Sequence, residues 1–184
     1  MVAKAKKDDK LTLEQLLKKY GYVLALGSDE MFQYEKIAFG IPALDKLLGG
    51  GIPRKRISIF TGQSNGGKSY LASQVAKMVQ KQDGISAWID SEISWDAKWM
   101  EKCGLDVDKI LVSQPSSGEE AFDMIRSLMN DGVDLIVLDS LAGLTPAVLQ
   151  DNDFGYNPMA WQARFVNQSL PRIMPCLKNN TAVI

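Results

Sequence analysis

A single glycine-rich stretch organises this chain: Gly62-Gln63-Ser64-Asn65-Gly66-Gly67-Lys68-Ser69. It fits the phosphate-binding pattern G-x-x-x-x-G-K-[S/T] at every defined position. Residues 56–61 before it alternate and are rich in β-formers, which predicts a strand, and apolar residues after it recur at helical spacing. A glycine-rich turn between strand and helix wraps a phosphate with backbone N–H groups, aided by the positive end of the helix. The stretch therefore predicts a nucleotide site.

Two side chains of this loop are expected to act directly on the nucleotide. Lys68 would reach the β- and γ-phosphates and act in catalysis, and the Ser69 hydroxyl would hold Mg²⁺. A chance Lys-Ser in an ordinary glycine-rich turn is the alternative, but the flanking strand and helix favour nucleotide binding. The predicted ATP-binding residues here are Gly62, Gln63, Ser64, Asn65, Gly66, Gly67, Lys68, Ser69 and Tyr70.

The amino-acid composition excludes several kinds of catalytic and binding site. The 184 residues are 46% hydrophobic and 23% charged, with a net charge of −1, so no global basic field attracts nucleic acid. The chain has no histidine, which excludes Ser-His-Asp and Cys-His catalysis and histidine-bound metals. Cys103 and Cys176 form no C-x-x-C pair, which favours free thiols in a reducing compartment. With no signal peptide or membrane span visible in the sequence, we expect a cytoplasmic protein.

Two further acids follow predicted strands. The strand at residues 85–90 delivers Glu92 just beyond its carboxyl end, where open α/β sheets place their ligands. A carboxylate there could activate water, although a loop or helix-start acid is an equal alternative from position alone. The apolar run at residues 134–139 ends in Asp139, as a Walker B strand does, which would put this carboxylate beside the phosphate-bound Mg²⁺.

The remaining segments support predictions about secondary structure and not about catalysis or ligand binding. A capping box, Thr12-x-x-Gln15, begins a short amphipathic helix that packs either on its own domain or on a neighbouring subunit. The basic run Arg54-Lys55-Arg56 is expected to cap a strand at the surface rather than to bind DNA. Residues 159–177 are helix-like, and Pro171 and Pro175 are expected to break or kink that helix.

Taken together, several strings resemble the RecA-type recombinases over about residues 36–184. They are Leu44-Asp45, the phosphate loop, Ile89-Asp90-Ser91-Glu92, Ser113-Gln114-Pro115 with Gly118-Glu119, and Asp139-Ser140 with Leu144-Thr145-Pro146. The resemblance implies an α/β P-loop NTPase fold, a RecA-like core whose mostly parallel central sheet is flanked by helices. Residues 1–35 would form an N-terminal tail and helix, a candidate oligomerisation element, and residues 36–184 the ATPase core.

The resemblance also implies a function. The family uses ATP and Mg²⁺, coats single-stranded DNA as a filament, and promotes pairing and strand exchange with homologous double-stranded DNA in recombination and repair. Such a protein is a DNA-dependent ATPase that self-associates into a filament or ring and has no membrane partner. The alternatives are a non-enzymatic nucleotide-binding or oligomerisation module, and a clock-type or helicase-type ATPase of the same fold.

Individual roles follow from the matched positions. Glu92 would be the base that activates water, Asp139 would hold Mg²⁺ with Ser69, and Asp96 with Trp99 would contact adenine. The family usually has Tyr where Trp99 stands, and either ring can stack. Residues 150–158 fall on the first DNA-binding loop. The predicted DNA-binding residues on the helix that follows are Met159 and Arg164.

The resemblance also sets an expectation about the end of the sequence. In the family, the strand that begins at Thr181 lies between the phosphate-loop strand and the Asp139 strand. It leads to a switch residue that senses γ-phosphate and to a second DNA-binding loop. We therefore expect this chain to be the N-terminal portion of a recombinase, either a fragment or one piece of an interrupted gene, whose core lacks its C-terminal part. Such a chain should not be a competent recombinase alone.

Overall fold

The computed structural model describes residues 11–21, 23–145, 158–178 and 180–184. These fall into two compact units, Met1–Tyr34 and Glu35–Ile184. The first unit contains helix α1 (Leu13–Tyr20) and a 3₁₀ turn, Glu30–Phe32. The predicted capping box is present: the Thr12 hydroxyl accepts from the Gln15 N–H, and the Gln15 side chain accepts from the Thr12 N–H. No residue of α1 is buried.

A parallel sheet forms the centre of the second unit, and its strand order is β4-β3-β5-β6. The strands are β3 (Ser86–Asp90), β4 (Ile110–Ser113), β5 (Leu135–Asp139) and β6 (Ala182–Val183). β3 pairs in parallel with both β4 and β5, and β5 pairs in parallel with β6. The predicted α/β fold with a mostly parallel central sheet is thereby confirmed.

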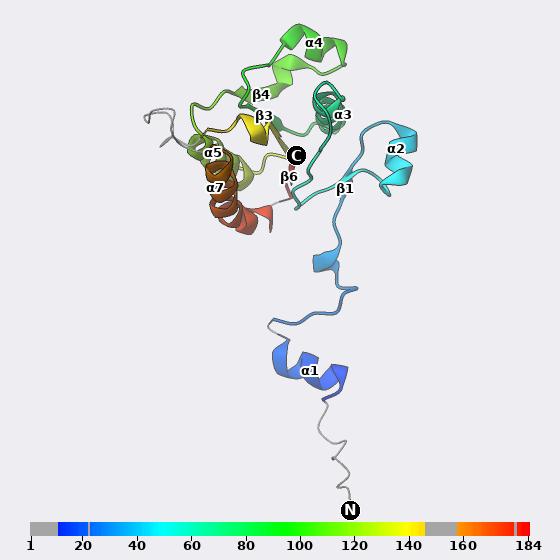
Figure 1. The fold of residues 1–184 in the computed structure, drawn as a ribbon. Coiled ribbons are helices and arrows are strands. Elements are labelled where there is room, and N and C mark those ends of the chain that lie inside the picture. The colour runs from blue at the N-terminus through cyan, green and yellow to red at the C-terminus, as the bar shows by residue number, and fades with distance from the viewer. Residues whose placement is uncertain (1–10, 22, 146–157, 179) are drawn as a thin grey trace, which may run out of the picture. The chain divides into compact units, whose positions relative to one another are not determined.

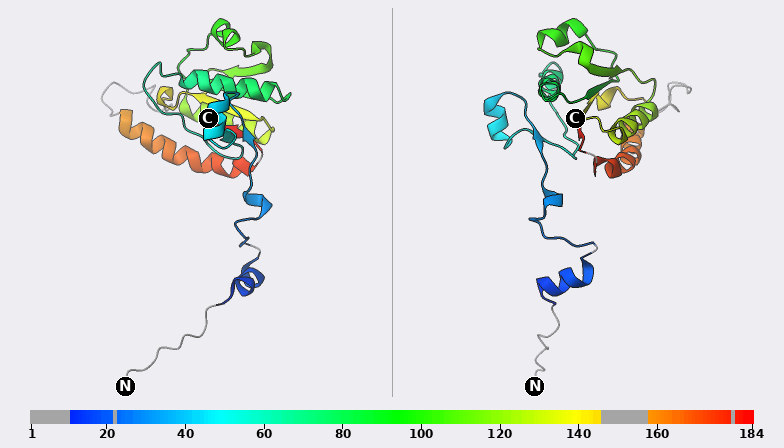
Figure 2. Two further views of the ribbon diagram at one scale, coloured as in Figure 1. Left: turned by 90° about the vertical axis from the view of Figure 1, so that its right-hand side faces the viewer. Right: turned by 180° about the vertical axis from the view of Figure 1, so that it is seen from behind.

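Helices cover both faces of this sheet (Figure 1). Helix α3 (Lys68–Gln80) packs on one face, while α5 (Gly118–Asn130) and α7 (Pro158–Ile173) lie on the other. Successive residues of the strands alternate between the two layers, as Trp88 and Ile89 of β3 show by joining different core clusters. The two views of Figure 2 keep α3 and α7 on opposite sides of the strands.

Smaller elements surround the sheet. Strands β1 (Lys36–Ile37) and β2 (Ile52–Pro53) pair antiparallel and enclose helix α2 (Pro42–Leu47). Helix α4 (Ala97–Lys102) follows β3, and 3₁₀ turns occur at Val107–Lys109 and Leu141–Gly143. Among the described residues, no helix is long and apolar enough to cross a membrane.

The strand predicted at residues 56–61 is wrong in extent, since only Ile57 forms a bridge, in parallel with Val183 of β6. The Val183 N–H donates to the Arg56 carbonyl, and the Ser58 N–H donates to the Val183 carbonyl. Within the part of the chain that the structure describes, no strand pairs with this segment beyond Ser58, and Ile59 is 74% exposed. The pairing nevertheless confirms that β6 lies between this segment and β5.

The expected surface position of Arg54 is also wrong. Its guanidinium is buried, lies 2.9 Å from the Asp134 carboxylate and donates to the Asn180 carbonyl at 3.1 Å. Glu35 lies 3.8 Å from the same side chain. Arg54 therefore joins the segment before the phosphate loop to the starts of β5 and β6, as a structural ion pair.

The expected break of the last helix occurs next to Pro175 and not at Pro171. Pro171 lies inside α7, which continues to Ile173, and a 3₁₀ turn, Met174–Lys178, then contains Pro175. A proline this close to a helix end removes one hydrogen bond of the last turn only. The buried side chains of Phe165 and Ile173 pack in the α5 core cluster, which holds the helix through that position.

Candidate functional site

The phosphate loop turns directly into α3. Asn65 and Gly67 have left-handed φ angles of +60° and +85°, and Gly67 is the N-cap of the helix. A Cβ at Gly67 would meet nothing within 4 Å, so glycine is favoured there by the backbone angle and not by crowding. Because the N-cap residue of α3 is a glycine, it has no side chain to accept from the first N–H groups of the helix, which suits these groups to a ligand of the loop.

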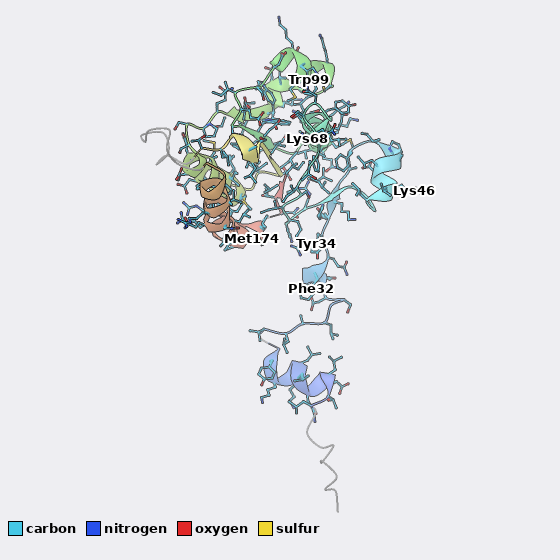
Figure 3. All side chains as sticks on the ribbon, viewed as in Figure 1. Phe32, Tyr34, Lys46, Lys68, Trp99 and Met174 are labelled. Atoms are coloured by element: carbon cyan, nitrogen blue, oxygen red, sulfur yellow. The ribbon has the colours of Figure 1, made fainter. Side chains whose placement is uncertain are left out.

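Lys68 begins α3 (Figure 3), and its side chain folds back over its own loop. Its ammonium donates to the carbonyls of Gly62, at 3.2 Å, and Gln63, at 2.9 Å. Both acceptors belong to the phosphate loop. The backbone carbonyls of the loop therefore hold the Lys68 ammonium at the predicted nucleotide site.

Ser69 joins the loop to the sheet. Its hydroxyl lies beside the carboxylate of Asp139 at the end of β5. Burial raises the pKa of the Asp139 carboxyl, and the charges of Glu92 and Asp90 raise that pKa further, while Ser69 and Lys68 oppose the rise. Several carboxylates therefore gather next to Lys68, an arrangement that a bound cation would relieve.

Glu92 lies in this same cluster, just beyond β3. The Ser140 hydroxyl donates to the Glu92 carboxylate, and the Ser91 hydroxyl donates to the Ser140 carbonyl. A Cβ at Gly143 would lie 2.9 Å from the Glu92 Cγ, so the 3₁₀ turn after β5 packs closely against the acid. We call Asp90, Glu92 and Asp139, at the carboxyl ends of β3 and β5, the acidic edge.

The residues predicted to contact adenine lie on α4. Asp96 is the N-cap of this helix and accepts from the Trp99 N–H at 3.2 Å. Trp99 is 38% exposed on the helix surface (Figure 3), and Tyr70 on α3 is 42% exposed. The structure thus brings Asp96 and Trp99 together, with an aromatic ring accessible to a ligand.

A largely apolar groove of about 200 Å³ adjoins the phosphate site. Lys68, Ser69 and Asp139 form one end of it, and α5, α7 and β6 supply apolar walls. The wall residues include Phe122, Ile125, Val166, Leu170, Ile173, Val183 and Ile184.

The predicted DNA-binding residues fall at the start of α7. Met159 is in its first turn, and Arg164 is exposed farther along the helix. The predicted first DNA-binding loop lies outside the described residues, except for Pro158, which begins α7.

Three polar residues of the site were missed as contributors by the sequence reasoning. Ser140 holds Glu92, and the buried Asp90 accepts a hydrogen bond at 2.9 Å from Gln114. The sequence does contain a signal, because Asp90 ends an apolar strand just as Asp139 does, and Gln114 directly follows another strand. Their contacts join segments distant in sequence, which periodicity does not reveal.

The site residues fit Mg²⁺. A carboxylate and a hydroxyl, Asp139 and Ser69, meet at the phosphate loop, and oxygen ligands of this kind suit Mg²⁺. Among the described residues, no group of three or more His, Cys, Asp or Glu side chains is arranged to hold a metal ion by itself. Mg²⁺ commonly binds through one or two protein oxygens together with substrate phosphates.

Comparison with known proteins agrees with this geometry. The chain is 38% identical to Protein RecA of Rhodopirellula baltica over 180 residues, which is 95% of this chain and 48% of that protein. It is 39% identical to Protein RecA of Thermus aquaticus over 89% of this chain and 49% of that protein. For Protein RecA of Wolinella succinogenes the identity is 40%, over 95% of this chain and 51% of that protein.

The chain thus spans about half the length of these curated relatives. The RecA N-terminal domain family matches residues 7–184, nearly the whole sequence. The matched range includes the phosphate loop, the acidic edge and α7. The chain therefore belongs to the RecA N-terminal domain family.

Proposed function

We propose that this chain binds and hydrolyses ATP with Mg²⁺ as the nucleotide-binding part of a DNA recombinase. The single observation that carries the proposal is that Lys68 and Ser69 of the phosphate loop line one groove together with Asp139. The groove joins the phosphate loop to the acid that ends β5, which is the arrangement that P-loop ATPases use. Residues 36–184 would form the ATPase core and residues 1–35 an element of self-association.

The loop residues would bind the phosphates. The backbone N–H groups of the glycine-rich loop and of the start of α3 would donate to phosphate oxygens. Lys68 would exchange its contacts with the Gly62 and Gln63 carbonyls for the β- and γ-phosphates. Ser69 and Asp139 would hold Mg²⁺, whose charge would offset that of the transferred phosphate.

Glu92 would accept a proton from the attacking water. The base needs to lie at the γ-phosphate end of the site, and the acidic edge places Glu92 close enough to Asp139 to raise the pKa of that carboxyl. In the present arrangement the Ser140 hydroxyl occupies one oxygen of Glu92. Ser140 therefore orients the carboxylate while the other oxygen can take the proton.

The remaining contacts concern adenine, DNA and subunits. Asp96 and Trp99 would bind the adenine ring, Tyr70 on α3 would also contact the nucleotide, and Met159 and Arg164 would contact single-stranded DNA. The unburied face of α1 suits docking on a second subunit of a filament. Pairing with homologous double-stranded DNA and strand exchange would follow in that filament.

Binding of a fluorescent ATP analogue tests the proposal directly. We expect saturable binding that requires Mg²⁺, is competed by ATP, and is lost in Lys68→Ala. Phosphate release and single-stranded DNA binding, each measured with and without the other ligand, then test the recombinase assignment. Tight nucleotide binding without any DNA effect would favour a nucleotide-binding module, and absence of nucleotide binding by the folded chain would overturn the proposal.

A further inference from the structure

Asp90 is the most enclosed charged group of the acidic edge. Its side chain is 1% exposed at the end of β3, and its register partner on β5 is Asp139. One carboxylate oxygen accepts from the Ser94 N–H at 3.0 Å and from the Ser94 hydroxyl at 3.3 Å. The other oxygen accepts from the Trp95 N–H at 3.0 Å and from the Gln114 amide at 2.9 Å.

These four donors keep the carboxylate charged despite its burial. Burial raises the pKa of Asp90, but the hydrogen bonds from Ser94, Gln114 and Trp95 together lower that pKa below its ordinary value. An ionised carboxylate only accepts hydrogen bonds, so it matches a surrounding made solely of donors. Removing it would leave several of those donors without a partner.

The groups that donate to Asp90 come from two segments, one of which carries residues predicted to act on the nucleotide. Ser94 and Trp95 belong to the loop after β3, which carries Glu92 before them and Asp96 after them. Gln114 lies at the end of β4, the neighbouring strand. Asp90 thus ties the loop to two strands of the sheet.

Trp95 is fixed a second time by packing. Its ring meets the buried Trp88 ring edge-on, with centroids 5.5 Å apart and planes at 64°. The loop is therefore held at its backbone by Asp90 and at its side chain by the core. A loop fixed in both ways presents Glu92 and the start of α4 at defined positions.

We propose that Asp90, with Gln114 as its partner, is a positioning residue that sets the loop bearing Glu92 and Asp96 for ATP. The proposal rests on the proposed nucleotide site. It also gives a role to Gln114 in the string Ser113-Gln114-Pro115, which is otherwise unexplained. Asp90 itself touches no nucleotide atom in this scheme and acts through the loop.

An exchange of donor and acceptor tests this role. Asp90→Asn puts an amide donor opposite the Gln114 donor, and Gln114→Glu in the same chain restores the match with unchanged net charge. We expect Asp90→Asn to lower affinity for Mg²⁺–ADP, and hydrolysis at saturating ATP, by roughly tenfold to a hundredfold. The double variant Asp90→Asn/Gln114→Glu should recover part of the hydrolysis loss, because the partner at position 114 is restored while the new amide still faces the Trp95 N–H.

Gln114→Ala serves if Asp90→Asn does not fold, because Gln114 is exposed and its removal leaves three of the four hydrogen bonds of Asp90. We expect a smaller loss, of roughly threefold to tenfold, in the same two measurements. Gln80→Ala is the matched control. The Gln80 amide also bridges two segments, bonding the N–H and carbonyl of Asp106 away from the site, so only thermal stability should change.

Two results would overturn the proposal. One is unchanged nucleotide affinity and hydrolysis in folded Asp90→Asn or Gln114→Ala, with only the melting temperature lowered as in Gln80→Ala. The other is a double variant no more active than Asp90→Asn alone. Failure of the wild-type chain to bind Mg²⁺–ADP would instead refute the proposed function, so the two failures are distinguishable.

Discussion

The phosphate loop and the acidic edge hold their charged side chains in different ways. Lys68 bonds carbonyls only 5 and 6 residues away along the chain. Glu92, by contrast, is held by Ser140, which is 48 residues distant, and Asp90 bonds Gln114, 24 residues distant, in addition to Ser94 and Trp95 of its own loop. The loop is a local structure that its own sequence specifies, whereas the acidic edge exists only when three parallel strands have assembled.

The largest effect is expected from the local region. Lys68→Ala removes the cation directed at the phosphates. We expect ATP hydrolysis to fall by at least a hundredfold, because a lost contact to the charge of the transition state costs two or more factors of ten, each worth about 1.4 kcal/mol. Phosphate release under saturating ATP measures this. Lys81→Ala, exposed at the C-cap of α3, is the control and should be as active as the wild type. Equal activity of both variants would contradict the assignment of the loop.

The next effect separates chemistry from binding at the acidic edge. In Glu92→Gln the amide retains the size of the acid but accepts no proton, so hydrolysis should fall roughly a hundredfold or more. ATP affinity, measured by titration, should change by less than about threefold. Glu101→Gln on α4 supplies an exposed control. A parallel loss of affinity and hydrolysis would make Glu92 a binding group instead.

A glycine of the phosphate loop can be compared with a glycine of the same backbone conformation outside the nucleotide site. Gly67 and Gly132 have φ angles of +85° and +81°, and a Cβ would meet nothing within 4 Å at either. Alanine at each should therefore lower stability by a similar amount, about 1–2 kcal/mol. Only Gly67→Ala should also weaken nucleotide binding, by roughly tenfold, because it distorts the phosphate loop. Equal nucleotide affinities in the two variants would show that the loop tolerates the change.

The smallest effect concerns the pH dependence of stability. Because the pKa of Asp139 is raised in the folded chain, ionising this carboxyl is less favourable in the folded than in the unfolded state. The resulting loss of stability develops as pH rises through the raised pKa and is absent at lower pH. Asp139→Asn should therefore melt a few degrees higher than wild type at pH 7 without metal, and the difference should shrink towards pH 4. Asp131→Asn, exposed after α5, should show no such trend. A constant difference across this range would contradict the cause given.

Much of the fold could be predicted because its determinants are local. The phosphate loop, the capping box at Thr12 and the apolar strands ending in Asp90 and Asp139 are each recognisable from a few consecutive residues. The alternating pattern at residues 56–61 predicted too long a strand. A strand needs a neighbouring strand to pair with, and only the first part of this segment pairs with β6. Arg54 was misplaced for a similar reason, since its partners Asp134 and Asn180 lie far along the chain.

The position of β6 has a consequence for the order of folding. Residues 55–58 bond to β6, and the joined segments are as distant in sequence as Arg54 and Asn180, which are 126 residues apart. During synthesis the phosphate-loop segment must wait, without its sheet partner, until β6 has left the ribosome. Such long-range parallel pairing is slow to form, because a large loop must close before any contact is gained. The nucleotide site should thus be among the last parts of the domain to mature, after β3, β4 and β5 have joined.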